Sequence, residues 1–207
     1  MRPRPYAVDP VVVVLTGGGS RRMGSHKPAL DVGGQPLVAR VLSAAGAWRS
    51  LVVGAGEGVP GGVWVVTEHV PGGGPVAGLA VAVATLDTDL PPGEVPEVVV
   101  VLAADLPFVT HAHVDRLVAA LVMGDAVVAP DLAVTVDREG RTNWLCAAWR
   151  TTALRSRLES LGDAHGRSMR DLCDGIRTVH VDDPLDVALD VDTPADLEHA
   201  RRRAGDV

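Results

Sequence analysis

The chain has 207 residues and a formal net charge of −7 at pH 7, with 47% hydrophobic but only 3% aromatic residues. This length suits one α/β domain, the hydrophobic content excludes a disordered chain, and the negative charge argues against a general affinity for nucleic acid. No apolar run reaches the roughly 18 residues of a membrane-spanning helix, and no signal-peptide core precedes the first predicted strand, so we expect a cytoplasmic protein that does not cross a membrane.

The first predicted element is a strand over residues 11–15, followed by a glycine loop. Its unbroken β-branched run is typical of a strand that is buried on both faces. Three consecutive glycines, at residues 17–19, follow the strand and Thr16, and the basic residues Arg21, Arg22 and Lys27 come next. Because glycines let main-chain N–H groups approach a phosphate closely, the stretch predicts a loop that holds a polyphosphate.

Lys27 is the only lysine among the 19 basic residues of the chain. Lysine offers a compact ammonium on a flexible stem, whereas arginine offers a planar fork, so a single lysine in this loop favours a phosphate ligand over an ordinary solvated surface residue. The charge distribution agrees with this interpretation, because residues 1–60 carry a net charge of +4 and the remainder carries −11.

The rest of the chain alternates predicted strands and helices, which indicates an α/β domain with a mostly parallel sheet. We predict a short strand-like piece with a Gly-Gly turn over 30–37, further strands over 50–54, 63–67, 98–104, 126–129, 143–150 and 178–181, and helices over 36–45, 77–86, 113–123, 151–161 and 166–173. Residues 131–141 are predicted to form a hairpin or an irregular excursion. A last helix is predicted after Thr193, which can cap it, with Pro194 in its first turn.

Asp105 follows the most hydrophobic run of the chain, at the carboxyl end of a predicted central strand. Ligands of α/β sheets bind at this end of the strands, and a carboxylate there is a hard oxygen ligand for Mg²⁺. The alternative is that Asp105 is only a turn residue or the N-cap of a helix. Cys146 and Cys173 lack metal-site spacing and are predicted to be buried, reduced thiols.

The glycine loop lacks the spacing of a P-loop, and no Gly-x-Gly-x-x-Gly frame opens a helix at the right place. Its pattern L-T-G-G-x-S-x-R-M-G-x-x-K-x-L instead resembles the molybdenum cofactor guanylyltransferases, which are similar to the nucleotidyltransferases that activate sugars. Gly-Pro-Val-Ala-Gly at 74–78, Asp-Leu-Pro at 105–107 and Asp-Thr-Pro at 192–194 resemble further family motifs in family order.

The resemblance implies a Rossmann-like three-layer α/β/α sandwich with a mostly parallel, mixed central sheet, as one nucleotidyltransferase domain over residues 1–207 with a flexible segment at 1–10. It implies transfer of GMP from GTP to the phosphate of molybdopterin carrying molybdenum, with Mg²⁺ as cofactor and pyrophosphate as product. It also leaves open a monomer or weak homo-oligomer and a protein that delivers or accepts the cofactor. The alternatives are a CTP-dependent cofactor cytidylyltransferase, a sugar-phosphate nucleotidyltransferase, and a nucleotide-binding regulatory protein without turnover.

The resemblance also assigns roles to residues. Lys27, Arg22 and Asp105 would be catalytic, and Asp105 would hold the metal, with Asp192 or Asp190 as a candidate second ligand. The expected nucleotide-binding residues are Leu15, Thr16, Gly17, Gly18, Gly19, Ser20, Arg22, Lys27, Glu68, Gly78 and Asp105.

Three positions depart from the family pattern. Glu68 stands where aspartate usually contacts guanine, and the alternative for it is a solvated side chain at a loop-to-helix turn. His26 replaces the aspartate before the lysine, and Gly54 replaces an asparagine that contacts the nucleotide.

Overall fold

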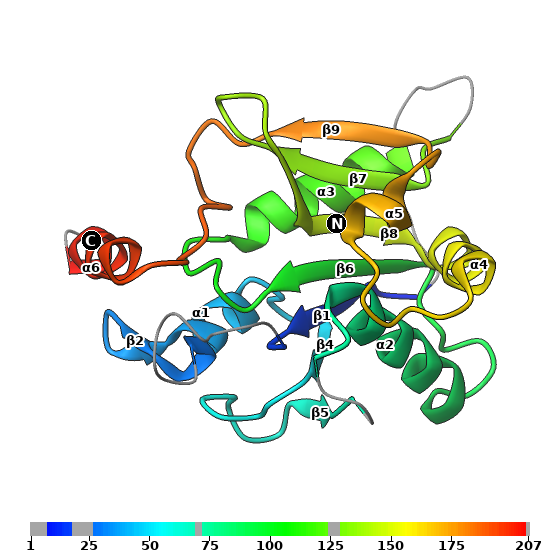
Figure 1. Cartoon of the computed structure of the whole chain (residues 1–207), viewed down its shortest axis with the longest axis horizontal. Helices are drawn as coiled ribbons and strands as arrows, with labels where there is room; N and C mark the ends of the chain where they lie inside the picture. Colours follow the sequence, from blue (N-terminus) through cyan, green and yellow to red (C-terminus); the bar gives the residue numbers. More distant parts are fainter. Residues whose placement is uncertain (1–7, 18–26, 69–71, 124–128, 206–207) are drawn as a thin grey trace.

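A seven-stranded sheet forms the centre of the computed structural model, which describes residues 8–17, 27–68, 72–123 and 129–205 (Figure 1). The strands follow the spatial order β5-β4-β1-β6-β8-β7-β9. Their bounds are β1 (Val11–Leu15), β4 (Arg49–Val53), β5 (Trp64–Val66), β6 (Val98–Ala103), β7 (Leu132–Val136), β8 (Thr142–Arg150) and β9 (Thr178–Asp182).

The sheet is mixed but mostly parallel. β1 pairs in parallel with β4 and β6, β4 with β5, and β7 with β9, whereas β8 runs antiparallel to both of its neighbours. The valines and leucine of β1 are all buried, as expected for a central strand with both faces covered. The prediction of a mostly parallel, mixed sheet is therefore confirmed.

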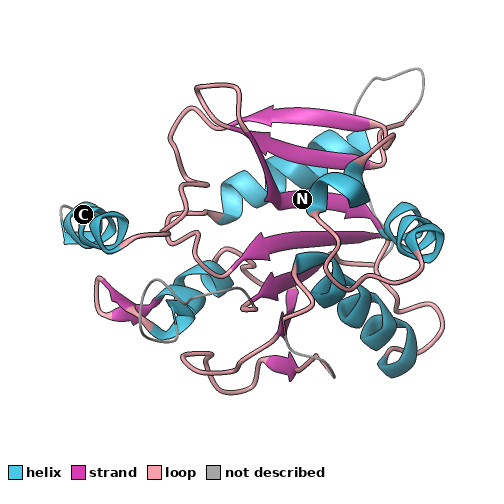
Figure 2. Ribbon diagram, viewed as in Figure 1, coloured by secondary structure: helices cyan, strands magenta, loops and turns pink. Residues whose placement is uncertain are grey.

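Helices cover both faces of the sheet, so the molecule has three layers (Figure 2). Val12 and Val14 of β1 pack in one core cluster with α1 and α3, and the alternate residues Val13 and Leu15 pack in the other with α2, α4 and α5. This alternation follows from the two-residue period of a strand. The helix bounds are α1 (Leu37–Ser43), α2 (Pro75–Asp89), α3 (His111–Met123), α4 (Thr151–Leu161) and α5 (Met169–Cys173).

A small hairpin and the last helix form a separate packing unit beside the sheet. The strands β2 (Asp31–Val32) and β3 (Gln35–Pro36) pair antiparallel, and the two glycines of the turn, Gly33 and Gly34, both have positive φ, which two-residue hairpins favour. The short 3₁₀ helix η2 (Lys27–Ala29) precedes the hairpin. Helix α6 (Pro194–Gly205) packs against the hairpin and the start of α1 through a third core cluster.

The hairpin that was one alternative for residues 131–141 is confirmed, because β7 pairs antiparallel with β8 across the turn at 137–141. Of the strand predicted at 126–129, residues 126–128 lie outside the described residues and Ala129 is not in a strand. The polar residue Thr135 interrupts the apolar run of β7, and its buried hydroxyl is satisfied: it donates to the Cys146 carbonyl oxygen (2.8 Å) and lies 2.8 Å from His113 Nε2. Because the Thr135 hydroxyl donates its hydrogen to the Cys146 carbonyl, it accepts a hydrogen bond from His113 Nε2–H. Burial lowers the pKa of His113.

Both cysteines are free and buried, as predicted. Burial raises the pKa of the Cys146 thiol to about 12, which keeps it protonated and unreactive. In the part of the chain that the structure describes, we find no helix that combines the length and the apolar character needed to span a bilayer.

Candidate functional site

The carboxyl ends of three parallel strands meet at one edge of the sheet. Leu15, the last residue of β1, lies in register with Val53 of β4 on one side and with Ala103 of β6 on the other. From β1 the chain passes through α1 to β4, and from β5 it returns through α2 to β6 on the opposite side of β1. Such a reversal of strand order opens a crevice where α/β sheets bind ligands.

Lys27 lies at this edge between two aspartates. Its Nζ is 2.6 Å from Asp105 Oδ2 and 2.8 Å from Asp192 Oδ1, and its side chain is only 12% exposed. Burial alone lowers the pKa of Lys27, but the two carboxylates together outweigh this effect and raise the pKa above its ordinary value. Lys27 is therefore a fully charged ammonium whose partners are separated from it by 78 and 165 residues in sequence.

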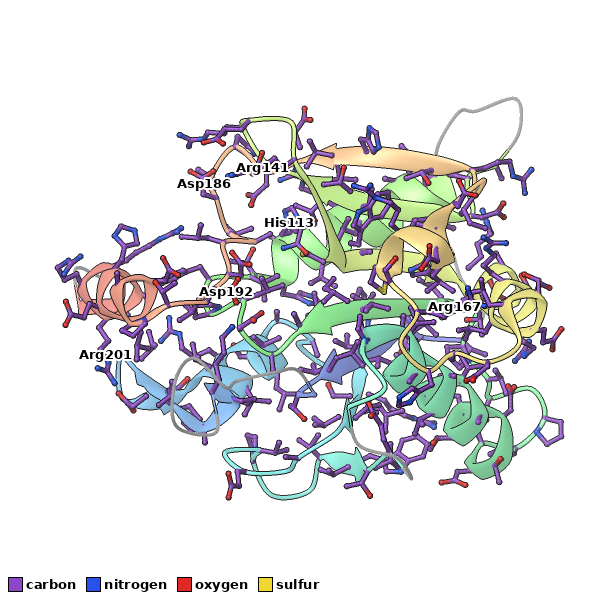
Figure 3. The ribbon with its side chains drawn as sticks, in the orientation of Figure 1. His113, Arg141, Arg167, Asp186, Asp192 and Arg201 are labelled. Carbon is purple, nitrogen blue, oxygen red and sulfur yellow. The ribbon has the colours of Figure 1, made fainter. Side chains whose placement is uncertain are left out.

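The start of α6 holds Asp192 in place (Figure 3). The Val191 N–H donates to the Asp105 carbonyl oxygen (3.0 Å), which ties the two aspartate-bearing segments together. Thr193 and Asp196 form a reciprocal cap: the Thr193 N–H donates to Asp196 Oδ2 (2.7 Å), and the Asp196 N–H donates to Thr193 Oγ1 (3.2 Å). The predicted capping role of Thr193 is thus confirmed, and it positions the residue before it.

Asp190 extends the acidic group. Burial raises its pKa, and repulsion by Asp192 and Asp105 raises it further. Asp190 therefore takes up a proton more readily than an ordinary aspartate, and Lys27 lies against the other two carboxylates.

The second part of the site surrounds the carboxylate of Glu68. A Cβ built on Gly17 would lie 3.5 Å from Glu68 Oε1, and one built on Gly78 would lie 3.3 Å from the same oxygen and 3.2 Å from Leu15 Cδ2. Gly17 follows β1, Glu68 follows β5, and Gly78 lies in the first turn of α2. The absence of a side chain at Gly17 and Gly78 thus lets their backbones approach the Glu68 carboxylate closely, at the place where the family resemblance implies that the base binds.

Thr16 and Gly54 connect the ends of β1 and β4. The Thr16 hydroxyl lies 3.1 Å from the Val53 carbonyl oxygen and 2.9 Å from that of Ala55, within donating distance of both. Gly54 has a φ of 116°, and a Cβ there would lie 2.6 Å from Thr16 Oγ1. In this backbone conformation, position 54 therefore admits no ordinary side chain.

We expect Gly54→Ala to destabilise the protein by about 1–3 kcal/mol, because alanine would combine an unfavourable φ with a collision against Thr16. Urea denaturation of the parent and the variant measures this difference. Gly61→Ala is the matched control, since Gly61 has no neighbour within 4 Å of the added Cβ. If Gly54→Ala were as stable as Gly61→Ala, the conclusion that position 54 admits no ordinary side chain would be wrong.

The structure brings seven of the predicted residues into two groups at one edge: Leu15, Gly17, Glu68 and Gly78 in one, and Lys27, Asp105 and Asp192 in the other, with Thr16 at the end of β1. Four others, Gly18, Gly19, Ser20 and Arg22, lie outside the described residues. The ammonium of Lys27 contacts carboxylates here, a contact that the sequence did not predict.

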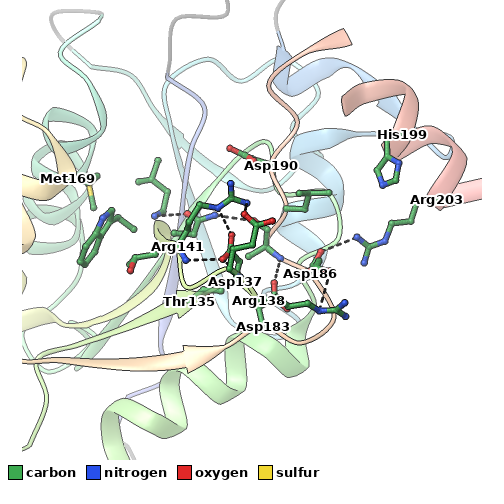
Figure 4. Close-up of a pocket in the computed structure, with 17 residues that line it drawn as sticks. Thr135, Asp137, Arg138, Arg141, Met169, Asp183, Asp186, Asp190, His199 and Arg203 are labelled. Carbon is green, nitrogen blue, oxygen red and sulfur yellow. Dashed lines mark hydrogen bonds and ion pairs between the residues drawn. The ribbon is translucent and has the colours of Figure 1, made fainter. Parts of the chain in front are cut away.

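A cavity of about 770 Å³ opens beside the acidic group, and Asp190 lines it (Figure 4). The wall combines Trp144 and Met169 with four basic side chains, Arg138, Arg141, His199 and Arg203, and with five acidic ones, Asp137, Glu139, Asp183, Asp186 and Asp190. Arg138 and Arg141 form ion pairs with carboxylates of this wall. Sequence reasoning missed this cavity, because its residues come from the β7–β8 turn, β8, α5, the segment after β9, and α6. The one available signal was the charged turn at 137–141.

The residues suit a magnesium ion that a substrate helps to hold. Within the described ranges, no group of three or more His, Cys, Asp or Glu side chains is placed to hold a metal ion by itself. Asp105 and Asp192 nevertheless converge on one cation, the ammonium of Lys27. Mg²⁺ is commonly bound through one or two carboxylates plus substrate phosphates, so this pair of carboxylates fits it.

Comparisons with known proteins agree with this geometry. Residues 12–180 match the family model described as "MobA-like NTP transferase domain". A relative named molybdenum cofactor guanylyltransferase, from Rhodobacter capsulatus, is 32% identical over 197 residues, which cover 92% of this chain and 94% of the relative.

Two solved structures share the fold. Molybdopterin-guanine dinucleotide biosynthesis protein A from Archaeoglobus fulgidus superposes with a TM-score of 0.72 at 20% identity, covering 95% of this chain and 100% of that one. The 2-C-methyl-D-erythritol 4-phosphate cytidylyltransferase from Thermus thermophilus has a TM-score of 0.62 at 20% identity, covering 94% of this chain and 98% of that one.

Proposed function

This chain belongs to the MobA-like NTP transferase domain family, and from that premise we propose that it transfers GMP from GTP to the phosphate of a molybdopterin-type cofactor and releases pyrophosphate. One observation carries the proposal: Lys27, Asp105 and Asp192 converge at the carboxyl ends of the central strands. An ammonium and two carboxylates at this edge are the groups that a transfer between phosphates requires.

In this reaction an oxygen of the acceptor phosphate attacks the α-phosphorus of the nucleotide, and the bond to the leaving pyrophosphate breaks. Little covalent chemistry falls to the protein, so its residues act by positioning the phosphates and by stabilising developing negative charge. Lys27 would donate to phosphate oxygens, together with main-chain N–H groups of the glycine loop and Arg22. Asp105 and Asp192 would hold Mg²⁺, which when bound neutralises phosphate charge.

The carboxylate of Glu68 supports guanine as the base. Guanine presents two adjacent donors, N1–H and the N2 amino group, and a carboxylate has two oxygens that can accept both. Cytosine presents a single amino group and lacks this adjacent pair.

The cavity beside Asp190 supports a binding site for the acceptor. It adjoins the acidic group, so an acceptor phosphate bound there would lie near the proposed metal ligands. The half-buried Trp144 offers an apolar surface for a ring system, and the charged lining offers hydrogen-bond donors and acceptors for its polar groups. We further propose a cytoplasmic location and a monomer or weak homo-oligomer; a protein that delivers or accepts the cofactor would approach this side.

A thermal-shift series with GTP, CTP, ATP and UTP, each with Mg²⁺, tests the base choice. We expect GTP to raise the melting temperature most, because a ligand that binds only the native state stabilises it by RT ln(1 + [L]/Kd). Glu68→Gln should reduce the GTP shift and leave the small CTP shift unchanged, since the amide replaces one acceptor by a donor.

Equal or greater stabilisation by CTP would favour the cytidylyltransferase alternative. A GTP shift without pyrophosphate release in the presence of the acceptor cofactor would instead favour a regulatory protein that binds the nucleotide without turnover.

A further inference from the structure

The two carboxylates proposed to hold a metal already share a cation of the protein itself. Lys27 Nζ donates to Asp105 Oδ2 at 2.6 Å and to Asp192 Oδ1 at 2.8 Å. The Lys27 side chain is 12% exposed and that of Asp105 24% exposed, so water screens this contact less than it screens a surface ion pair. The ammonium thus lies where the two carboxylates would meet a metal ion.

An ammonium and a divalent cation compete for this pair of carboxylates. Two carboxylates with one ammonium carry a net charge of −1, whereas adding a divalent ion without moving Lys27 would place two cations within contact distance. Charges of like sign at such distances repel strongly even at a high effective dielectric constant. Lys27 has a flexible four-carbon stem, and its neighbouring glycine loop is the predicted phosphate site, so a bound triphosphate would offer it new partners.

We propose that Lys27 acts as an internal counter-ion, which fills the cation position between Asp105 and Asp192 in the nucleotide-free protein and leaves it when a divalent cation binds. The inference rests on the proposed nucleotidyl transfer and deepens it. Its consequence is conditional metal binding: the free protein binds a divalent cation weakly, and the metal enters the site together with the triphosphate, whose oxygens receive the ammonium that the metal displaces.

Because Lys27 is the only lysine of the chain, an amine-selective reagent reports on it directly in the unmodified protein. The protein is treated with an acylating ester at fixed pH and increasing Mn²⁺, and mass spectrometry follows the peptide that contains Lys27, with an added unstructured lysine peptide as reference. We expect Mn²⁺ to raise the labelling rate of Lys27 relative to the reference peptide, because the released ammonium loses both carboxylates. An unchanged or reduced rate at saturating Mn²⁺ would overturn the proposal.

A variant gives the second measurement. Removal of the competing charge in Lys27→Met should lower the Kd for Mn²⁺, measured by electron paramagnetic resonance without nucleotide, by about tenfold or more. Arg177→Met is the matched control, because it removes the same charge from another ion pair, the one with Asp131 at 2.7 Å. We expect the Arg177→Met control to bind Mn²⁺ with the affinity of the parent. We expect the double variant Lys27→Met, Asp192→Asn to bind Mn²⁺ more weakly than Lys27→Met alone, because it has lost one of the two carboxylates.

An Mn²⁺ affinity in Lys27→Met equal to or weaker than that of the parent would contradict the proposal. None of these measurements uses a nucleotide, so their failure is distinguishable from that of the proposed function. If Mn²⁺ displaced Lys27 but CTP stabilised the protein more than GTP, GTP would be refuted as the substrate. The role of Lys27 as a counter-ion would still hold.

Discussion

Asp105→Asn is expected to lower turnover by about 10²-fold or more while leaving the fold intact, because the amide keeps the shape of the side chain and removes the charge proposed to hold the metal. Pyrophosphate release from GTP in the presence of the acceptor cofactor measures the rate, and the melting temperature monitors the fold. Asp87→Asn is the matched control, since Asp87 pairs with Arg155 outside the site and its loss should leave turnover unchanged.

If Asp105→Asn turned over within a few-fold of the parent, Asp105 would not be the main metal ligand. Asp192 would then be the better candidate, because it is the other carboxylate that contacts Lys27. The same measurement on Asp192→Asn would distinguish the two residues.

Lys27→Arg is expected to lower turnover sharply, on the order of 10²-fold, although it preserves the charge. The planar guanidinium is larger than an ammonium and would misplace its donors against the phosphates. The melting temperature of the ligand-free protein should change little, because arginine can still pair with Asp105 and Asp192. Steady-state kinetics and thermal unfolding of the same preparation test both statements.

Lys27→Ala should reduce turnover at least as much, and it should also lower stability, because it leaves two neighbouring carboxylates without their cation. Turnover of Lys27→Arg at the parental rate would show that Lys27 is not the phosphate ligand. Arg22, in the same loop, would then be the better candidate.

The parts of the fold set by local pattern could be predicted from the sequence. The buried strand at 11–15, the Gly-Gly turn at 33–34 and the cap at Thr193 each follow from a short stretch of residues, and the structure confirms all three. The hairpin around 137–140 was one of two alternatives for its segment, and the antiparallel pairing of β7 with β8 confirms it. The buried position of Thr135 could not be predicted, because its partners His113 and Cys146 are distant in sequence.

The site was also predicted only in part: single residues were identified from the sequence, but their contacts were not. Lys27 and Asp105 were identified one by one, Lys27 from its rarity and Asp105 from its place after a buried strand. Their direct contact joins positions 78 residues apart, which no local pattern encodes. The cavity beside Asp190 was missed for the same reason, since tertiary packing alone assembles its wall. Glu68 was identified only through a family resemblance, and Gly17 and Gly78 acquire their meaning beside it once the strands are aligned.

The contact between Lys27 and Asp192 has a consequence for the synthesis of the protein on the ribosome. It spans 165 residues, and Asp192 lies directly before α6, the last helix of the chain. Although β1 and the glycine loop are synthesised first, their lysine cannot meet its second carboxylate until almost the entire chain has left the exit tunnel. A contact of such long range is also formed late in folding, since the intervening chain must first be ordered. A nascent chain that has not reached Asp192 therefore carries the glycine loop without the second of the two carboxylates.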